Sequence, residues 1–244
     1  MQPCERAVES GDSRPFPDWI ASKVLGHLPE ATSVTELDRA ALLKVYRSYA
    51  PLYDLLFGRL LDAGRAAMAA RVPSDTRRLL EVGVGTGLAL PRYPRGAQLV
   101  GVDLSPDMLR RAQSRVRDRG LRDATGKHPQ LLCADAEQLP FADASFDCIT
   151  LPYVLSVTPN PTRLLAELRR VCQPGGRVLI LNHFSGAGVW GGAERLLAGF
   201  AHRVGFNSRL PITLLDHPEW TLRALRSVNL LGLSKLAELT HAPD

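Results

Sequence analysis

From Arg77 onward, short apolar runs alternate along the chain with patterns typical of amphipathic helices. The apolar runs are Leu79–Val84, Leu99–Val102, Leu131–Cys133, Phe146–Leu151 and Val178–Leu181, and the helical patterns are Pro106–Arg119 and Pro161–Cys172. Continuous apolar strands that alternate with helices are typical of a parallel sheet covered on both faces. Because crossover connections are right-handed, the pattern predicts a doubly wound α/β fold. Two further runs, Trp220–Val228 and Leu233–Thr240, predict an antiparallel pair that completes a mostly parallel seven-stranded sheet.

The residues before this alternation have a helical pattern. One run from Pro51 to Val72 opens with proline, which suits a first helical turn, and it ends before Pro73. We therefore expect residues 1–74 to form an N-terminal helical cap that faces membrane or substrate. Residues 75–244 are expected to form the α/β core.

The charge of the chain limits its partners. It carries 30 Lys and Arg against 25 Asp and Glu, and much of the excess lies between Arg110 and Lys127. A basic surface attracts nucleic acid or anionic lipid, although a solvated arginine-rich helix face explains the cluster equally well. No aromatic residue lies within the cluster, which weakens a base-stacking role, and we expect no nucleic-acid partner.

Three further features concern location and metals. The longest uncharged apolar stretches, near residues 149–157 and 184–193, are far shorter than a membrane span of about 20 residues. The polar N-terminus is not typical of a secretory signal, so we expect a cytoplasmic protein. No two of the four cysteines have C-x-x-C spacing, so we expect no metal site. We also expect a monomer.

Three glycines follow the first apolar run at every second position, in the stretch LLEVGVGTG. In a doubly wound sheet, ligands bind beyond the carboxyl ends of the strands, and glycine there lets a ligand approach the backbone. The spacing is G-x-G-x-G rather than the dinucleotide pattern G-x-G-x-x-G, which favours a smaller ligand with a charged amino-acid end. Tight turns use glycine too, so the triplet alone does not establish a binding loop.

Acids follow the second and third strands. Asp103 lies about twenty residues after the glycines, where a carboxylate accepts two hydrogen bonds from a ribose diol. Its alternative role is a helix cap, but Ser105 and Pro106 already supply the cap and the first turn. Asp135, in CADAEQLPF, is placed to accept a bond from an adenine amino group, and the fourth strand ends beside the same cleft.

Taken in order, LLEVGVGTG, VDLSPDML, CADAEQLPF, SFDCIT and QPGGRVLIL resemble the motifs of class I S-adenosylmethionine-dependent methyltransferases. The resemblance implies a Rossmann-like sheet, with the methionine end of the cofactor S-adenosylmethionine in the glycine loop. Glu81 would order that loop or receive the ammonium group through it, and Met108 would pack on the adenine. The implied cofactor contacts are Glu81, Gly83, Gly85, Gly87, Asp103, Leu104, Met108, Asp135, Ala136 and Leu151.

The segments YRSYAPLYDLLFGRLLDAGR and EVGVGTGLALPRYP are similar to bacterial phospholipid N-methyltransferases. That family converts phosphatidylethanolamine to phosphatidylcholine by successive methylations. The later segment VNLLGLSKLAEL is also similar, although the family often has an aromatic or bulky residue where Leu233 or Ser234 stands here. Quinone C-methyltransferases share the Y-x-x-x-Y-D segment, so a quinone or other small-molecule C- or O-methyltransferase is an alternative. A nucleic-acid-binding protein that keeps the fold is a second alternative, motivated by the basic cluster.

An amine acceptor needs a group that takes up its proton and a site that tolerates an ammonium group which becomes larger with each added methyl. Aromatic rings favour methylated ammonium groups and hydroxyls bond amine hydrogens, which makes Tyr46, Tyr49, Tyr53 and Tyr153 candidate catalytic residues. His183, after the fifth strand, is a candidate base or amine-positioning residue. The spacing of the first three tyrosines equally fits a helix packing stripe, and a histidine bonded to backbone at a loop start is an equal alternative for His183.

Two arginines, Arg195 and Arg203, are candidate ligands of a lipid phosphate, because arginine binds phosphate through two parallel bonds. Arg195 lies in a glycine-rich apolar segment that, with Trp19 and Trp190, could lie on a bilayer surface. We therefore expect a phospholipid substrate and peripheral association with the anionic inner face of the membrane.

Overall fold

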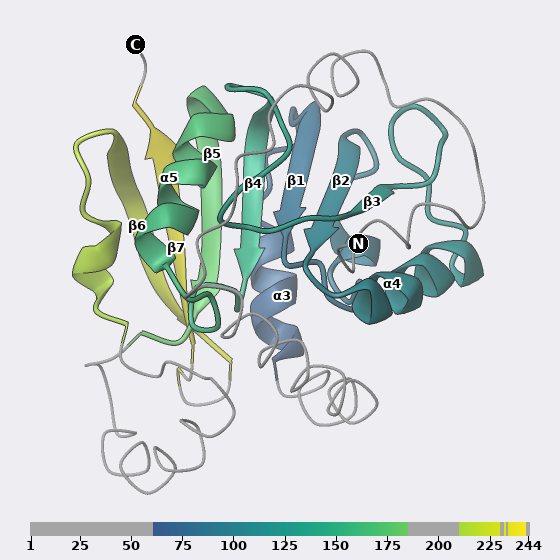
Figure 1. Ribbon diagram of the computed structural model, residues 1–244, viewed down its shortest axis with the longest axis horizontal. Coiled ribbons are helices and arrows are strands. Elements are labelled where there is room, and N and C mark those ends of the chain that lie inside the picture. The colour runs from purple at the N-terminus through teal and green to yellow at the C-terminus, as the bar shows by residue number, and fades with distance from the viewer. Residues whose placement is uncertain (1–60, 185–209, 230–231, 233, 243–244) are drawn as a thin grey trace, which may run out of the picture.

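The computed structural model describes residues 61–184, 210–229, 232 and 234–242. Within these ranges, helices lie on a seven-stranded sheet (Figure 1). The strands are β1 (Arg78–Val82), β2 (Gln98–Asp103), β3 (Gln130–Cys133), β4 (Phe146–Pro152), β5 (Cys172–Asn182), β6 (Trp220–Val228) and β7 (Ser234–His241). The α-helices are α3 (Asp62–Ala69), α4 (Pro106–Asp118) and α5 (Pro161–Val171), with 3-10 turns at Leu90–Arg92 and Ile212–Leu215.

The strand order across the sheet is β3-β2-β1-β4-β5-β7-β6. The first five strands in this order pair in parallel, and β7 pairs antiparallel with both β5 and β6. The predicted doubly wound, mostly parallel sheet of seven strands is confirmed. Because parallel strands share a direction, the carboxyl ends of β1 to β5 all lie at one edge of the sheet, the lower edge in Figure 1. Asn182 at the end of β5 pairs with Lys235 near the start of β7, so the turn between β6 and β7 lies at this edge too.

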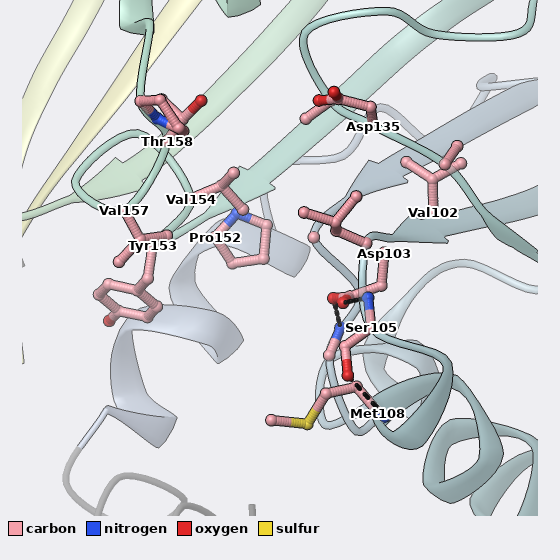
Figure 2. Close-up of a pocket in the computed structure, with 16 residues that line it drawn as sticks. Val102, Asp103, Ser105, Met108, Asp135, Pro152, Tyr153, Val154, Val157 and Thr158 are labelled. Carbon is pink, nitrogen blue, oxygen red and sulfur yellow. Dashed lines mark hydrogen bonds between the residues drawn. The ribbon is translucent and has the colours of Figure 1, made fainter. Parts of the chain in front are cut away.

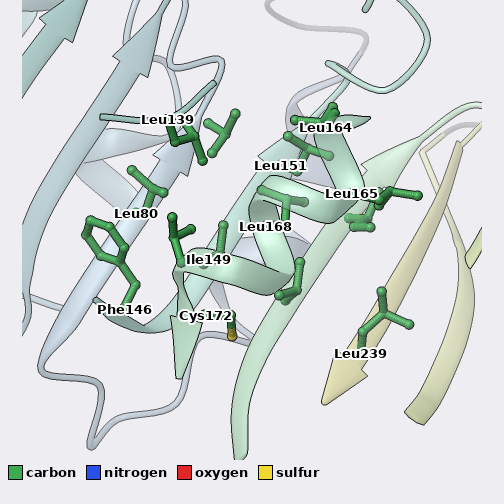
Figure 3. Close-up of a cluster of buried hydrophobic side chains, with 14 of the residues drawn as sticks. Leu80, Leu139, Phe146, Ile149, Leu151, Leu164, Leu165, Leu168, Cys172 and Leu239 are labelled. Carbon is green, nitrogen blue, oxygen red and sulfur yellow. The ribbon is translucent and has the colours of Figure 1, made fainter. Parts of the chain in front are cut away.

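The two faces of the sheet bury separate apolar clusters, because successive strand residues point to opposite faces. Leu80 of β1 and Ile149 of β4 pack against Leu164 and Leu168 of α5 on one face (Figure 3). Leu79, the neighbour of Leu80, joins the cluster of α3 and α4 on the other face. A leucine side chain that is fully buried contributes about 1.5–3 kcal/mol, so helices on both faces fix the sheet that carries the site.

Two strand boundaries differ from the prediction. β1 ends at Val82 rather than Val84, because the next residue, Gly83, has a φ of 75° and turns the chain. β5 starts at Cys172 rather than Val178 and runs through the stretch Pro174–Gly176. Its pairing with β4 is irregular between Phe146 and Cys148, which absorbs the extra residues.

The predicted N-terminal cap falls mostly outside the described residues. The last helix of the cap, α3, packs on the core, and its Met68 side chain is fully buried there. The division of the chain at residue 74 stays a prediction. In the described part of the chain, every helix is too short or too polar to cross a bilayer.

Candidate functional site

The glycine loop after β1 is built from left-handed backbone. Gly83, Gly85 and Gly87 have φ values of 75°, 54° and 77°, which residues with a Cβ rarely adopt. The N–H groups of Gly83 and Val84 both donate to the carbonyl of Val102, at 2.8 and 2.9 Å, and so tie the loop to the end of β2. The sequence therefore needs glycine here for its backbone shape, before any ligand is considered.

The three glycines have different surroundings. A Cβ at Gly83 would lie 2.0 Å from Cγ2 of Val154, so the loop after β4 packs directly on this glycine. A Cβ at Gly85 would meet nothing within 4 Å, so the space beside this Cα is open and faces the pocket. Gly87 instead packs against Leu90 and Ala112 and does not line the pocket.

Asp103, at the end of β2, joins the loop to the next helix. Its carboxylate accepts the N–H of Gly85 at 2.7 Å and the N–H of Ser105 at 2.9 Å. Burial raises the pKa of this carboxyl, and the two backbone bonds oppose the rise. A carboxylate has about four lone-pair positions, so two acceptor positions remain for a ligand diol. The helix cap is Ser105, whose hydroxyl accepts from the N–H of Met108.

The pocket lies between two walls at the carboxyl edge of the sheet. Figure 2 shows Tyr153 and Val154 on one side and Asp103 and Met108 on the other. Its lining comprises Gly83, Gly85, Val102, Asp103, Leu104, Ser105, Met108, Ala134, Asp135, Ala136, Pro152, Tyr153, Val154, Val157, Thr158 and Pro159. Most of the implied cofactor contacts therefore come together here: Gly83, Gly85, Asp103, Leu104, Met108, Asp135 and Ala136.

Besides Gly87, two implied cofactor contacts lie outside the pocket, and both are strand residues. Leu151 is fully buried in the cluster under α5, while its neighbour Pro152 lines the pocket. Adjacent residues of a strand face opposite sides, so the last two residues of β4 have different surroundings. Glu81 lies within β1 and is only 1% exposed, beneath the glycine loop rather than in the pocket.

Glu81 belongs to a buried polar cluster. Burial raises the pKa of its carboxyl to about 8, while a hydrogen bond from Tyr93 and the nearby Arg65 guanidinium oppose the rise. The Tyr93 hydroxyl also lies 3.0 Å from the hydroxyl of Thr150 on β4. This cluster places ionisable groups under the loop, and sequence reasoning did not find its members Arg65, Tyr93 and Thr150.

The loop after β4 supplies a wall that no motif predicted. Val154, Val157, Thr158 and Pro159 line the pocket, and the position of this loop after a parallel strand is the signal that points to them. The loop is held by Glu137, whose carboxylate accepts from the Thr158 hydroxyl and from the N–H of Asn160, both at 2.7 Å. Glu137 follows Asp135 and Ala136, so one buried carboxylate joins the two loops.

Of the expected acceptor-side residues, the structure describes Tyr153 and His183. Their rings lie 5.3 Å apart, and Tyr153 is a pocket residue with a φ of 62°. His183 follows β5, and its Nδ1 lies 3.3 Å from the Ser234 hydroxyl. The other expected residues, Tyr46, Tyr49, Tyr53, Arg195 and Arg203, lie outside the described residues. No cluster of three or more metal-ligating side chains occurs in the described part of the chain.

The pocket fits the groups of S-adenosylmethionine. The open space at Gly85 allows an amino-acid end to approach the loop, and Asp103 has acceptor capacity for a ribose diol. Met108 and Ala136 offer apolar surface for an adenine ring. The donor and acceptor set of the pocket thus agrees with the cofactor that the motifs imply.

Comparisons with known proteins agree with this geometry. A family described as "Methyltransferase domain" matches residues 80–180. The chain is 39% identical over 178 residues to a phosphatidylethanolamine N-methyltransferase of Cereibacter sphaeroides, covering 72% of this chain and 84% of that protein. It is 32% identical over 200 residues to a demethylmenaquinone methyltransferase of Deinococcus radiodurans, covering 73% and 79%. In fold it is similar to an S-adenosylmethionine-dependent methyltransferase of Methanosarcina mazei, with a TM-score of 0.59, 19% identity, and coverage of 73% and 98%.

Proposed function

Because the chain belongs to the class I S-adenosylmethionine-dependent methyltransferases, we propose that it methylates phosphatidylethanolamine and its mono- and dimethyl forms, which gives phosphatidylcholine. The observation that carries the proposal is the 39% identity to a phosphatidylethanolamine N-methyltransferase over 84% of that enzyme. Bound in the pocket, S-adenosylmethionine supplies an electrophilic methyl group carried on a sulfonium. The contribution of the protein is then to hold both reactants in line.

The described residues divide this work between the two walls of the pocket. Gly83, Gly85 and Asp103 would hold the amino-acid end and the ribose, and Met108, Asp135 and Ala136 would hold the adenine. On the other wall, the Tyr153 ring would face the acceptor nitrogen, because aromatic faces attract methylated ammonium groups. His183 lies beside Tyr153, outside the pocket lining, and would take the proton that a primary ammonium must lose before its lone pair attacks.

We extend the proposal to peripheral association with anionic membrane. The exposed basic residues of α4 and of the segment after it support this extension: Arg110, Arg111, Arg117, Arg119, Arg122 and Lys127. Each basic side chain near an anionic surface contributes about 1 kcal/mol to binding. The helix starts at the pocket with its cap Ser105, so lipid bound along α4 would lie close to the acceptor site.

The test of the proposed function is expression of the chain in a host that lacks phosphatidylcholine, followed by mass spectrometry of its lipids. New mono-, di- and trimethylated phosphatidylethanolamine is the expected result. Initial rates on the three lipid acceptors then test the residues. Tyr49→Phe, Tyr53→Phe and His183→Ala should slow the first methylation more than the last, because the primary amine offers these side chains more N–H hydrogens than the dimethylated amine does. Equal losses on all three acceptors would show that these side chains do not serve the acceptor.

A quinone C-methyltransferase is the second candidate function. It is favoured by the 32% identity to a demethylmenaquinone methyltransferase over 79% of that enzyme, and by the apolar side chains that line much of the pocket. Expression in a strain that accumulates a demethylated quinone separates the two. Methylation of the quinone, with no change in the lipids, would replace the proposed function.

A further inference from the structure

The side chain of Asn229, in the turn after β6, joins three separate segments at the carboxyl edge of the sheet. Its carbonyl oxygen accepts the N–H of Gly64 in α3 at 2.6 Å. Its amide nitrogen donates to the Tyr153 hydroxyl at 2.9 Å and to the Ser234 hydroxyl at 2.8 Å. An asparagine amide offers two N–H donors, and both are used here.

The backbone at Asn229 favours this residue type. Its φ is 65°, in the left-handed region that asparagine tolerates better than most residues with a Cβ. The carbonyl of Asn229 also accepts the N–H of Gly232, which closes the turn at 3.2 Å. The turn therefore presents the carboxamide in one fixed direction, toward Tyr153.

The bond from Asn229 determines which part of Tyr153 faces the pocket. Figure 2 shows the Tyr153 hydroxyl pointing away from the opposite wall, so the ring rather than the hydroxyl lines the cavity. The residue has a φ of 62°, a strained conformation for a side chain of this size, and its N–H donates to the Leu181 carbonyl at 2.6 Å. A hydroxyl that accepts one bond keeps its own hydrogen and a further lone pair, so the bond expected between the Tyr153 hydroxyl and an amine hydrogen stays a prediction.

The second N–H of Asn229 reaches His183 indirectly. Ser234 is almost fully buried, and its hydroxyl takes the bond from Asn229 while lying 3.3 Å from Nδ1 of His183. One carboxamide thus fixes both described acceptor-side groups, Tyr153 directly and His183 through Ser234.

We propose that Asn229 is a positioning residue for the methyl acceptor, which holds the Tyr153 ring and the His183 imidazole in the places that the reaction needs. The proposal rests on the proposed function in one respect, that Tyr153 and His183 face the acceptor. It predicts that Asn229 acts mainly through the Tyr153 hydroxyl, to a lesser extent through Ser234 and His183, and leaves cofactor binding unchanged.

The surroundings of Gly64 independently support close packing of α3 against the side chains of Asn229 and Tyr153. A Cβ there would lie 2.8 Å from both the Asn229 amide nitrogen and the Tyr153 oxygen. Alanine in place of a helical glycine normally favours the helix. Gly64→Ala should nevertheless lower activity, because its methyl group displaces the side chains that Asn229 holds.

The test is a double-mutant cycle of Asn229→Gly and Tyr153→Phe. Glycine keeps the left-handed backbone and removes only the carboxamide. Each single change should lower kcat/KM for phosphatidylethanolamine vesicles about tenfold at saturating S-adenosylmethionine, and the double change should lower it little further. Affinity for S-adenosylhomocysteine should stay within about twofold. Ser227→Ala, which removes a 2.6 Å bond to Lys235 in the same hairpin, is the matched control and should keep full activity.

A second readout does not depend on the acceptor. In protein labelled with ¹³C-tyrosine, the Tyr153 resonance, assigned with Tyr153→Phe, should shift in Asn229→Gly while the Tyr93 resonance stays in place. An unshifted Tyr153 resonance, or losses in the cycle that multiply, would overturn the proposal. If wild-type protein methylates a demethylated quinone instead of the lipid, the proposed function fails, and the same cycle on that acceptor decides the role of Asn229.

Discussion

The two walls of the pocket are built in different ways. On the wall proposed for the cofactor, which we call the cofactor wall, Gly83, Gly85 and Asp103 lie within about twenty residues of one another, and backbone N–H groups make the bonds that hold them. On the wall proposed for the acceptor, which we call the acceptor wall, Tyr153 is held by the side chains of Asn229 and Ser234, far along the chain, and by contact with α3. The first wall is a local backbone turn, whereas the second exists only when distant segments have packed.

Because the two walls are held in different ways, we expect them to respond differently to substitution. A backbone turn accepts few substitutions, because its φ values and N–H directions are fixed by glycine and by one carboxylate. A wall held by side chains can change its shape by single substitutions, without loss of the fold. We therefore expect cofactor binding and acceptor handling to respond to separate sets of variants.

The largest effect, on the pH dependence of folding stability, is expected at Glu81, which lies beneath the cofactor wall. Its pKa in the folded protein is about 8, raised by burial from the ordinary value of 4.5, so the folded state holds a proton that the unfolded state releases. Stability from this group is complete below about pH 4.5 and is lost as the pH rises through about 8. Urea unfolding between pH 5.5 and 8.5 should show this fall, and Glu81→Gln should flatten it. The exposed Glu219→Gln is the control; an unchanged slope in Glu81→Gln would contradict the assignment.

Asp103→Ala should produce the largest loss of cofactor affinity. Each hydrogen bond to a charged group contributes about 1.5–3 kcal/mol, so calorimetry with S-adenosylhomocysteine should show at least a tenfold weaker affinity. Tyr153→Phe in the same experiment should bind like wild type, which would separate the two walls. If Asp103→Ala binds the cofactor as tightly as wild type, Asp103 does not hold the ribose, and the two walls do not differ in the way described above.

The glycines should give a smaller effect that differs between neighbours. Gly83→Ala places a Cβ 2.0 Å from Val154, so thermal unfolding should show a lower Tm, partly restored by Val154→Ala. Gly85→Ala meets no atom of the protein, and its backbone strain of about 1–2 kcal/mol should lower stability less. Its methyl group occupies the open space of the pocket, so the cofactor should bind more weakly. Equal loss of Tm in both variants would show that only backbone strain matters.

The smallest effect is expected on the outer surface of α4. Arg111→Ala and Arg117→Ala should each weaken binding to vesicles that contain phosphatidylglycerol by about fivefold. This change corresponds to the loss of about 1 kcal/mol for each basic residue. Sedimentation at rising salt should show the same decline. Arg223→Ala, on β6 at the other end of the sheet, is the control. Cofactor affinity should not change in any of these variants. Equal binding to neutral and anionic vesicles at every salt concentration would exclude an electrostatic contribution to membrane binding.

The sequence was enough to predict the cofactor wall because its signals are local. Alternating apolar runs gave the parallel strands, and glycines followed by Asp103 marked the carboxyl ends of β1 and β2. Leu151 lies in the core and its neighbour Pro152 lines the pocket, because the motif does not say which of two neighbouring strand residues faces the core.

The acceptor wall could not be predicted in the same way. Nothing near Asn229 in sequence indicates that its amide meets Tyr153, which is 76 residues away. The contact depends on the antiparallel register of β7 with β5, and register is a property of the packed sheet. Similarly, Gly64 looks like an ordinary helical residue until the space around its Cα is known.

The position of β7 between β5 and β6 has a consequence for synthesis of the protein. The five parallel strands leave the ribosome before β6 and β7, and translation adds about 5–20 residues per second. Until β7 is made, β5 presents an unpaired edge to other nascent chains, which is a known route to aggregation. Only when Lys235 of β7 pairs with Asn182 of β5 is the second wall closed. A chain still being translated would therefore form the proposed cofactor site before it forms the proposed acceptor site.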